Sequence, residues 1–530
     1  MYLAGSISKN GDAYAIALNA MNCATDEVVA NSEVVAENRD GVIGVLGESG
    51  KLMRRRLGES LPSLARFNKE LAQATTSSLE ALQAYSAGME ILSTKGQAES
   101  LPYLQRAVTL DPNFASAFAA LGTGYLALHQ MDAANENLRR AFELRQRVSE
   151  REKFAIESNY YQHVTGETDR VIQTSIEWIG LYPSDSGPHS RLGLNYLRLG
   201  ETEKAVQALW EAQRLAPNVM GNYGNLSAAY LTLEKYDEAK AVLGAAKSRN
   251  LDAVGLRING YDLAFCEGDR TTMQKIVDAA MGKPGYEDGL LALQADTEAY
   301  YGHVAQARKL QQQAMAAAAR DGARDRIAYY NAYAAWRESE LGDKRMARQH
   351  AKEALSASDG RDIKELVGLA LANVGDTTAA KKLADQLDQE YPQATLIQAY
   401  ALPTIRALID IKASRPAAAL EKLRAALQYE LGYAEFGNLE PTYVRGLAYL
   451  EIGDGRAAAV EFQKLAAHPG EIDNFVTGAL AHLQLARAAK MSGDIDQARK
   501  HYQDFLALWK DADPDIPILK QAKVEYGRLK

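Results

Sequence analysis

The amino-acid sequence predicts a mainly α-helical protein, a superhelical solenoid of short antiparallel helix pairs that follows a small N-terminal α/β module. Three observations predict this architecture. Helix-favouring residues are abundant, and apolar residues make up 47% of the chain against 24% charged, as in ordinary folded proteins. Marker residues recur every 34 positions, such as Gly88 with Gly122 and Pro183 with Pro217. The first 58 residues instead show short apolar runs separated by turn sequences.

Residues 1–58 are expected to fold as the α/β module. An Asn-Gly pair at positions 10–11 stands between two apolar runs, which is a strong signal for a β-hairpin. A second turn leads into a third apolar run at 28–35, so we expect a three-stranded meander. Helical spacing over 40–57 predicts one helix. The core of such a unit is thin, and a further strand or helix upstream of Met1 would complete it.

Residues 59–78 are expected to form a linker. They contain Pro62 and a Thr-Thr-Ser-Ser run, which is poor helix but good capping sequence, and Ser78 is expected to cap the first repeat helix. Residues 79–510 are then expected to form about twelve helical hairpins. Residues 511–530 begin with a helix-breaking segment rich in Asp and Pro and end in a capping helix, which gives the solenoid a polar end.

The best-defined hairpin shows why each unit needs small residues. Gly193 and Ala205 let the two helices approach closely, and Leu192 and Tyr196 fill the space beside them. Gly200 is expected to end the first helix in a left-handed conformation. The period of 34 residues is that of the tetratricopeptide repeat, whose hairpins bury their apolar faces only by stacking. Later units keep the same spacing through Gly-Asp pairs, which lie at 268–269, 342–343, 375–376 and 493–494.

Composition and motifs do not support catalysis, cofactor binding, metal binding or nucleic-acid binding, and we assign no residue to those roles. A net charge of −8 leaves no basic face for phosphates. The stretch from Gly47 to Lys51 resembles a phosphate-binding loop, but the first glycine and the Ser or Thr of that motif are missing, so we expect helix there. The eight histidines lack zinc-ligand spacing and are expected at the surface or in the groove. Cys23 and Cys266 are expected to be small buried side chains.

The location of the chain is inferred from what its sequence lacks. No run of 18 or more apolar residues is present, so no membrane span is expected, and the N-terminus lacks the pattern of a secretion signal. We therefore expect a cytoplasmic protein. If Met1 instead begins a fragment of a membrane-anchored protein, an extracytoplasmic location is the alternative.

Several stretches resemble a known family. Residues 56–60 (Arg-Leu-Gly-Glu-Ser), 110–115 (Leu-Asp-Pro-Asn-Phe-Ala) and 509–517 (Trp-Lys-Asp-Ala-Asp-Pro-Asp-Ile-Pro) are similar to the C-terminal region of bacterial serine/threonine protein kinases that bear tetratricopeptide repeats. The resemblance covers essentially the whole chain. It implies a sensor or docking region that follows a kinase domain, often with a membrane span between them. This sequence contains neither a kinase domain nor a span, so the resemblance implies no ATP site here.

The predicted function is a non-catalytic scaffold for protein–protein interaction, which serves as the docking or regulatory region of a bacterial signalling system. The first helix of each hairpin is expected to line an open concave groove that takes a protein or peptide partner. The alternative is a ligand-sensing domain that regulates an attached or partner serine/threonine kinase or a transcription regulator. The groove residues assigned to partner contact are Asn195, Arg198, Asn222, Asn225 and Tyr230.

Overall fold

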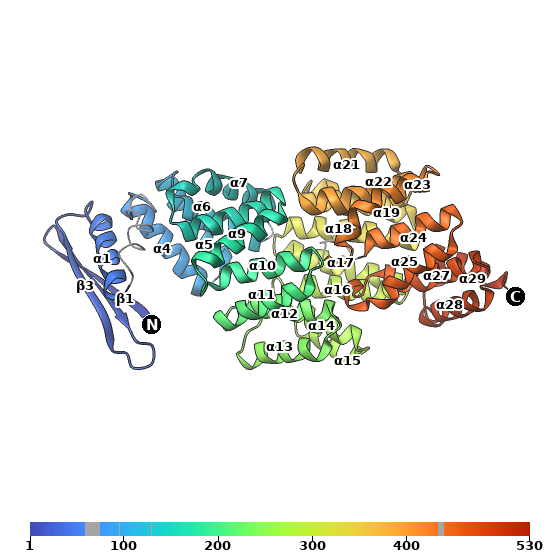
Figure 1. The fold of residues 1–530 in the computed structure, drawn as a ribbon, viewed down its shortest axis with the longest axis horizontal. Helices are drawn as coiled ribbons and strands as arrows, with labels where there is room; N and C mark the ends of the chain where they lie inside the picture. The colour runs from blue at the N-terminus through green and yellow to red at the C-terminus, as the bar shows by residue number, and fades with distance from the viewer. Residues whose placement is uncertain (59–70, 72–74, 95, 129, 433–438, 530) are drawn as a thin grey trace. The chain divides into compact units, whose positions relative to one another are not determined.

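The structure of the chain is a computed structural model that describes residues 1–58, 71, 75–94, 96–128, 130–432 and 439–529 (Figure 1). It divides into two compact units, Met1–Val164 and Thr165–Lys530, and each is described by itself. Most of the predicted linker lies outside the described residues. The predicted fold class is confirmed, since helical hairpins follow a small antiparallel sheet. None of the described helices is both long enough and apolar enough to cross a bilayer.

The first unit begins with the three-stranded antiparallel sheet that the sequence predicted (Figure 1). The strand order follows the chain, and Ile16 in the middle strand pairs with Ile7 on one side and Val34 on the other. One helix packs on the second and third strands, and Ile16, Ala36 and Val42 form a small buried core. The first strand is therefore left exposed along its whole length. The bounds are β1 (Tyr2–Asn10), β2 (Ala13–Met21), β3 (Val28–Ala36) and α1 (Val42–Arg56).

Helical hairpins follow in the same unit. The Ser78 hydroxyl accepts a hydrogen bond from the backbone N–H of Ala81 at 3.2 Å, which confirms Ser78 as the cap of the first repeat helix. Glycine allows the two helices of a hairpin to touch, because a Cβ added at Gly122 would lie 2.7 Å from the Leu138 side chain. The helices are α4 (Leu79–Thr94), α5 (Gln97–Leu110), α6 (Ala115–Ala127), α7 (Met131–Glu143) and α8 (Glu150–Asn159), with helical turns η1 (Arg145–Arg147) and η2 (Tyr160–Thr165).

The second unit is a succession of hairpins, each made of a first and a second antiparallel helix. Helix α9 (Thr168–Leu181) begins the unit and α29 (Pro517–Gly527) ends it. The hairpins are α10 (Ser186–Arg198) with α11 (Thr202–Leu215), α12 (Met220–Thr232) with α13 (Tyr236–Ser248), α14 (Val254–Cys266) with α15 (Arg270–Asp278), α16 (Glu287–Tyr300) with α17 (Val304–Arg320), α18 (Arg324–Leu341) with α19 (Lys344–Ala357), α20 (Arg361–Asn373) with α21 (Thr377–Glu390), α22 (Leu402–Lys412) with α23 (Pro416–Leu423), α24 (Glu440–Ile452) with α25 (Gly455–Ala467), and α27 (Val476–Met491) with α28 (Ile495–Leu508). Short turns between them are η3 (Ile397–Ala401), η4 (Arg424–Tyr429) and α26 (Pro469–Ile472). The expected total of about twelve hairpins stays a prediction, because the two units are described separately.

The Gly-Asp pairs noted in the sequence form the tips of hairpins. Gly342 and Gly375 both have a φ of +85°, so each ends a first helix in the left-handed conformation. The following aspartate caps the second helix, as the Asp343 carboxylate does by accepting a hydrogen bond from the Met346 N–H at 3.0 Å. One dipeptide therefore ends one helix and begins the next.

The later hairpins of the second unit pack against the earlier ones, so its superhelix closes on itself. In Figure 1 the red helix α27 lies beside the yellow helix α16, and the two are in contact. The Trp509 indole N–H donates a hydrogen bond to the Tyr300 carbonyl at 2.9 Å, and the Asp513 N–H donates to the Gly302 carbonyl at 3.0 Å. The expectation of an open groove is wrong for this part of the unit, because helices far apart in the sequence meet and fill the interior.

The structure agrees with the prediction for the stretch that resembles a phosphate-binding loop but not with the prediction for the cysteines. Residues 47–51 lie inside α1, as expected for helix. The cysteines do not match the prediction of buried side chains, since Cys23 is exposed and Cys266 is only half-buried. The reason is position: Cys23 lies in the turn between β2 and β3, and Cys266 is the last residue of α14.

Candidate functional site on the inner helices

The first helices of the hairpins line the inside of the second unit. Neighbouring first helices contact one another, as α10 does with α12 and α12 with α14, and we call the first helices of the hairpins the inner helices. From α18 onward the inner helices are buried along most of their length. Helices α10, α12 and α14 keep more exposed and half-exposed positions. The accessible part of the interior therefore lies on α10, α12 and α14.

A row of glycines marks one end of the inner helices. Gly187, Gly221, Gly255 and Gly289 are each 34 residues apart and lie in the first turns of α10, α12, α14 and α16, and we call them the glycine row. Gly221 and Gly255 are exposed, and a Cβ added to either would have no neighbour within 4 Å among the described residues. These glycines were not singled out from the sequence, although their even spacing is a signal that could have found them.

Packing against the described residues does not explain why Gly221 and Gly255 are glycines. Glycine in a helix is less stable than alanine by about 0.5–1 kcal/mol, because it loses more backbone freedom on folding. An alanine at Gly221 or Gly255 would touch no other described residue. A protein uses glycine where another backbone must come close, because a side chain would be in the way. These two glycines are therefore candidates for contact with a partner.

The same helix ends offer hydrogen-bond donors. Neither α12 nor α14 has a side chain that caps its N-terminus, and neither has an acidic residue in its first turn. First-turn N–H groups have no partner within their helix, and the helix dipole is positive there, so such ends attract carbonyl oxygens and carboxylates. Beside the end of α12, Val219 and Met220 are 49% and 41% exposed. The open part of the glycine row thus combines donors with an apolar contact.

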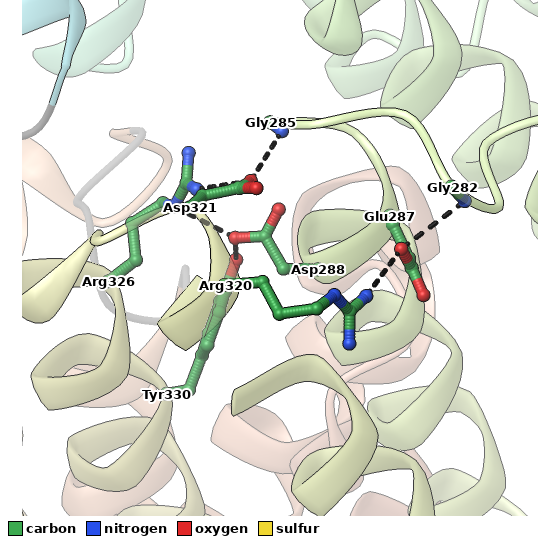
Figure 2. A network of polar contacts seen from close by, with 8 residues as sticks. All are labelled: Gly282, Gly285, Glu287, Asp288, Arg320, Asp321, Arg326 and Tyr330. Atoms are coloured by element: carbon green, nitrogen blue, oxygen red, sulfur yellow. Dashed lines mark hydrogen bonds and ion pairs between the residues drawn. The ribbon is translucent and has the colours of Figure 1, made fainter. Parts of the chain in front are cut away.

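At α16 the corresponding helix end is occupied by the chain itself (Figure 2). Asp288 is buried, accepts a hydrogen bond from the Tyr330 hydroxyl at 2.9 Å and pairs with Arg326 at 2.8 Å. Arg326 also pairs with Asp321 at 3.2 Å. Through Arg326 and Tyr330, these contacts hold the first turn of α16 to the start of α18. Gly289 is therefore at the closed end of the glycine row.

The five residues assigned to partner contact from the sequence all lie on α10 and α12. Asn195 and Asn222 are buried, and each donates its side-chain amide to a backbone carbonyl of the unit, at 2.8 and 2.9 Å. Those hydrogen bonds tie both side chains to the backbone of the unit, and the contact of Asn195 and Asn222 with a partner stays a prediction. The half-buried members stay predicted contacts, and they are Arg198, Asn225 and Tyr230.

The deeper inner helices bury ion pairs. Arg337 on α18 is 2% exposed and pairs with Asp296 on α16 at 2.5 Å. The Arg308 guanidinium binds both carboxylate oxygens of the buried Glu338, at 2.8 and 2.7 Å. Removing one partner of such a pair leaves an uncompensated buried charge, so these contacts hold neighbouring hairpins in one arrangement.

Glu340 on α18 and Glu440 on α24 form a group of buried acids. Burial raises the pKa of Glu340 to about 7, and the positive charge of Lys412 opposes this shift. Burial, together with the charge of Glu340, raises the pKa of Glu440 well above its usual range. The Asn373 amide donates a hydrogen bond to Glu340 at 2.6 Å, whereas Oε1 of Glu440 has no hydrogen-bond partner among the described residues. Both carboxyls therefore keep their protons to a higher pH than exposed carboxyls do.

Replacing Glu340 with glutamine is expected to change how stability depends on pH. The pKa of Glu340 in the folded protein, about 7, lies above its unfolded value of about 4.3, so the folded state binds more protons between these values. Stability therefore falls as the pH rises through this window, by up to about 4 kcal/mol for such a shift. In Glu340→Gln the neutral amide keeps an acceptor for Asn373 and has no charge to bury. The variant should be more stable than wild type at about pH 8 and similar at about pH 5.

Urea unfolding followed by tryptophan fluorescence measures this difference, since all four tryptophans lie in the second unit. The matched control is Glu421→Gln, whose side chain is 72% exposed and whose pH profile should follow wild type. Parallel pH profiles for wild type and Glu340→Gln would contradict the raised pKa.

Comparison with known proteins places this geometry in a class. Residues 189–219 and 221–252 match the family model described as tetratricopeptide repeat, and these segments contain most of α10 and α12 and all of α11 and α13. The second unit is thus a solenoid that contains tetratricopeptide repeats, a fold that serves protein–protein interaction. A search of curated protein sequences returned no match.

Three solved structures illustrate the similarity at low sequence identity. A chain of the APC/C hetero-tetramer Cut9-Hcn1 is 11% identical, with 92% of this chain and 94% of that chain covered and a TM-score of 0.43. Yeast Tom70 is 12% identical, with 85% and 95% covered and a TM-score of 0.32. PilW, described as a widely conserved type IV pilus biogenesis factor, is 15% identical, with 40% and 99% covered and a TM-score of 0.31. The kinase link expected from the sequence stays a prediction.

Proposed function

We propose that the chain is a non-catalytic scaffold that binds an extended segment of a protein partner along the open part of the glycine row. The observation that carries the proposal is the pair Gly221 and Gly255, two exposed helix positions one repeat apart where an added Cβ would meet none of the described residues within 4 Å. Carbonyl or carboxylate oxygens of the partner face the uncapped first turns of α12 and α14. Val219 and Met220 supply the apolar part of the contact.

The biological setting we propose is the docking or regulatory region of a bacterial signalling system. The stretches that resemble repeat-bearing bacterial kinases support this setting. Arg198, Asn225 and Tyr230 extend the proposed surface from the glycine row along α10 and α12. A scaffold of this kind needs no reacting group of its own, because its work is to hold a partner.

Filling the glycine row should abolish binding without harming the fold. Gly221→Leu and Gly255→Leu place a side chain where the partner backbone is proposed to lie, so each should weaken binding at least about tenfold, or about 1.4 kcal/mol. Alanine at these sites should leave stability unchanged or raise it by about 0.5–1 kcal/mol, because helix propensity improves. Leucine also favours helix over glycine, so the leucine variants should be at least as stable as wild type, and unfolding cannot account for their loss of binding.

The partner is first captured with the wild-type chain from extracts of the source organism, identified, and then titrated calorimetrically as a purified protein. The matched control is Gly244→Leu on α13, an exposed helical glycine that also has no neighbour within 4 Å among the described residues. A second set, Arg198→Glu and Asn225→Asp, tests the extension of the surface. Unchanged affinity in both leucine variants would overturn the proposal.

A further inference from the structure

The last hairpin of the second unit brings together three side chains that can bind a metal ion. His482 lies on α27, and His501 and Asp504 lie on α28. One ring nitrogen of each histidine and one carboxylate oxygen of Asp504 all lie within 4.8 Å of one another. Residues three apart share one face of a helix, and the antiparallel packing of α27 on α28 brings His482 to that face.

Both imidazoles have a nitrogen that the protein does not use. Nδ1 of His482 and Nδ1 of His501 are buried, and neither has a hydrogen-bond partner among the described residues. Buried polar atoms without a partner are rare, since each costs about 1–3 kcal/mol in lost solvation. Two histidines on facing helices, each with a buried nitrogen left unpartnered by the described residues and both near a carboxylate, present groups that a cation can bind.

We propose that His482, His501 and Asp504 form a binding site for a divalent transition-metal ion of the zinc class. Zinc binds imidazole nitrogen and carboxylate oxygen at about 2.0–2.2 Å, so ligands around a tetrahedral ion are about 3.4 Å apart. In the structure the three ligand atoms lie within 4.8 Å of one another, so binding the ion requires them to draw closer together. Calcium and magnesium prefer a shell of six or more oxygens, which this set does not offer. The fourth position is open to water.

A metal ion at the proposed site would link α27 to α28, the two helices of the hairpin that closes the superhelix. Helix α27 packs against α16 and α18, and Trp509, directly after α28, donates a hydrogen bond to Tyr300. A metal that ties α27 to α28 stabilises the closed arrangement, because it binds only when the hairpin is formed. From the sequence no histidine was expected to be a ligand, since these two are 19 residues apart and only the hairpin removes that separation.

The test is a metal titration of the full chain after treatment with a chelator. Zinc binding is measured by calorimetry, and cobalt absorption spectra report the geometry. Wild type should bind one ion at this site, and its melting temperature should rise with zinc. His482→Gln and His501→Gln should each weaken binding at least about tenfold and remove the rise, and Asp504→Asn should have a smaller effect. His189→Gln on α10 is the matched control and should behave as wild type.

Two further measurements separate a loss of metal binding from a loss of folding. Circular dichroism and melting of the metal-free variants establish that each still folds. Zinc that binds with equal affinity to wild type and to the double variant His482→Gln/His501→Gln would overturn the proposal, because such ions sit on scattered surface groups. A cobalt spectrum that lacks tetrahedral absorption would overturn the assigned ligand geometry.

Discussion

The substitution Gly302→Ala should destabilise the second unit by about 2–5 kcal/mol. Gly302 has a φ of +80°, where a side chain costs about 1–2 kcal/mol. A Cβ there would also lie 2.5 Å from the Cβ of Ala512 and 3.1 Å from the Trp509 ring. Overpacking of this kind costs about 1–3 kcal/mol more. The loss of stability caused by overpacking arises where Gly302 meets Trp509 and Ala512, which is the contact that closes the superhelix.

A matched glycine separates the two contributions. Gly375 occupies the same hairpin-tip position with a φ of +85°, but an added Cβ there would have no neighbour within 4 Å among the described residues. Gly375→Ala should therefore cost only the backbone strain, about 1–2 kcal/mol. Urea unfolding by tryptophan fluorescence gives both values, and hydrogen exchange should show faster opening near Ala512 in Gly302→Ala alone. Equal losses in the two variants would mean that closure adds nothing to stability.

Arg337→Leu should destabilise the second unit by about 3–5 kcal/mol at pH 7. The substitution leaves the Asp296 carboxylate buried without its guanidinium partner, which stood 2.5 Å away. Burial already raises the pKa of Asp296, and Arg337 opposes that rise. Loss of Arg337 therefore raises this pKa further, so the carboxyl takes up a proton more readily. The destabilisation should shrink as the pH falls towards about 5.

Two further variants test whether the unpaired charge of Asp296 causes the loss of stability in Arg337→Leu. The double variant Arg337→Leu/Asp296→Leu removes both charges and should recover most of the lost stability, because an apolar pair of similar size replaces a buried ion pair at little cost. Arg499→Leu breaks an exposed pair with Asp496 and should leave the urea midpoint unchanged. A double variant no more stable than Arg337→Leu would show that packing, and not the unpaired charge, caused the loss.

Local sequence signals predicted the hairpins because each signal acts within one repeat. Gly200 and Gly342 end helices because glycine takes a positive φ without strain, and Asp343 caps the next helix a few residues away. Gly193 is required because Leu209 of the same hairpin occupies the space beside it. The Asn-Gly turn and alternating apolar residues predicted the N-terminal sheet for the same reason.

The candidate sites were less visible in the sequence. Asn195 and Asn222 resemble groove residues in their position, yet their amides bond backbone carbonyls inside the unit. The glycine row could have been found from its 34-residue spacing, but its exposure could not. His482 and His501 look unrelated in the sequence, since only the pairing of α27 with α28 brings their nitrogens together.

By itself the sequence determined the class of fold, the repeat length, the helix ends at the Gly-Asp pairs and the three strands, since each of these depends on residues within about one repeat of one another. Only the tertiary structure decided that the superhelix of the second unit closes, which charges it buries and which helix ends stay open to a partner. The contacts that close the unit join Tyr300 to Trp509 and Gly302 to Asp513. No repeating pattern encodes such pairs, because they depend on the small rotation between successive hairpins summed over many repeats.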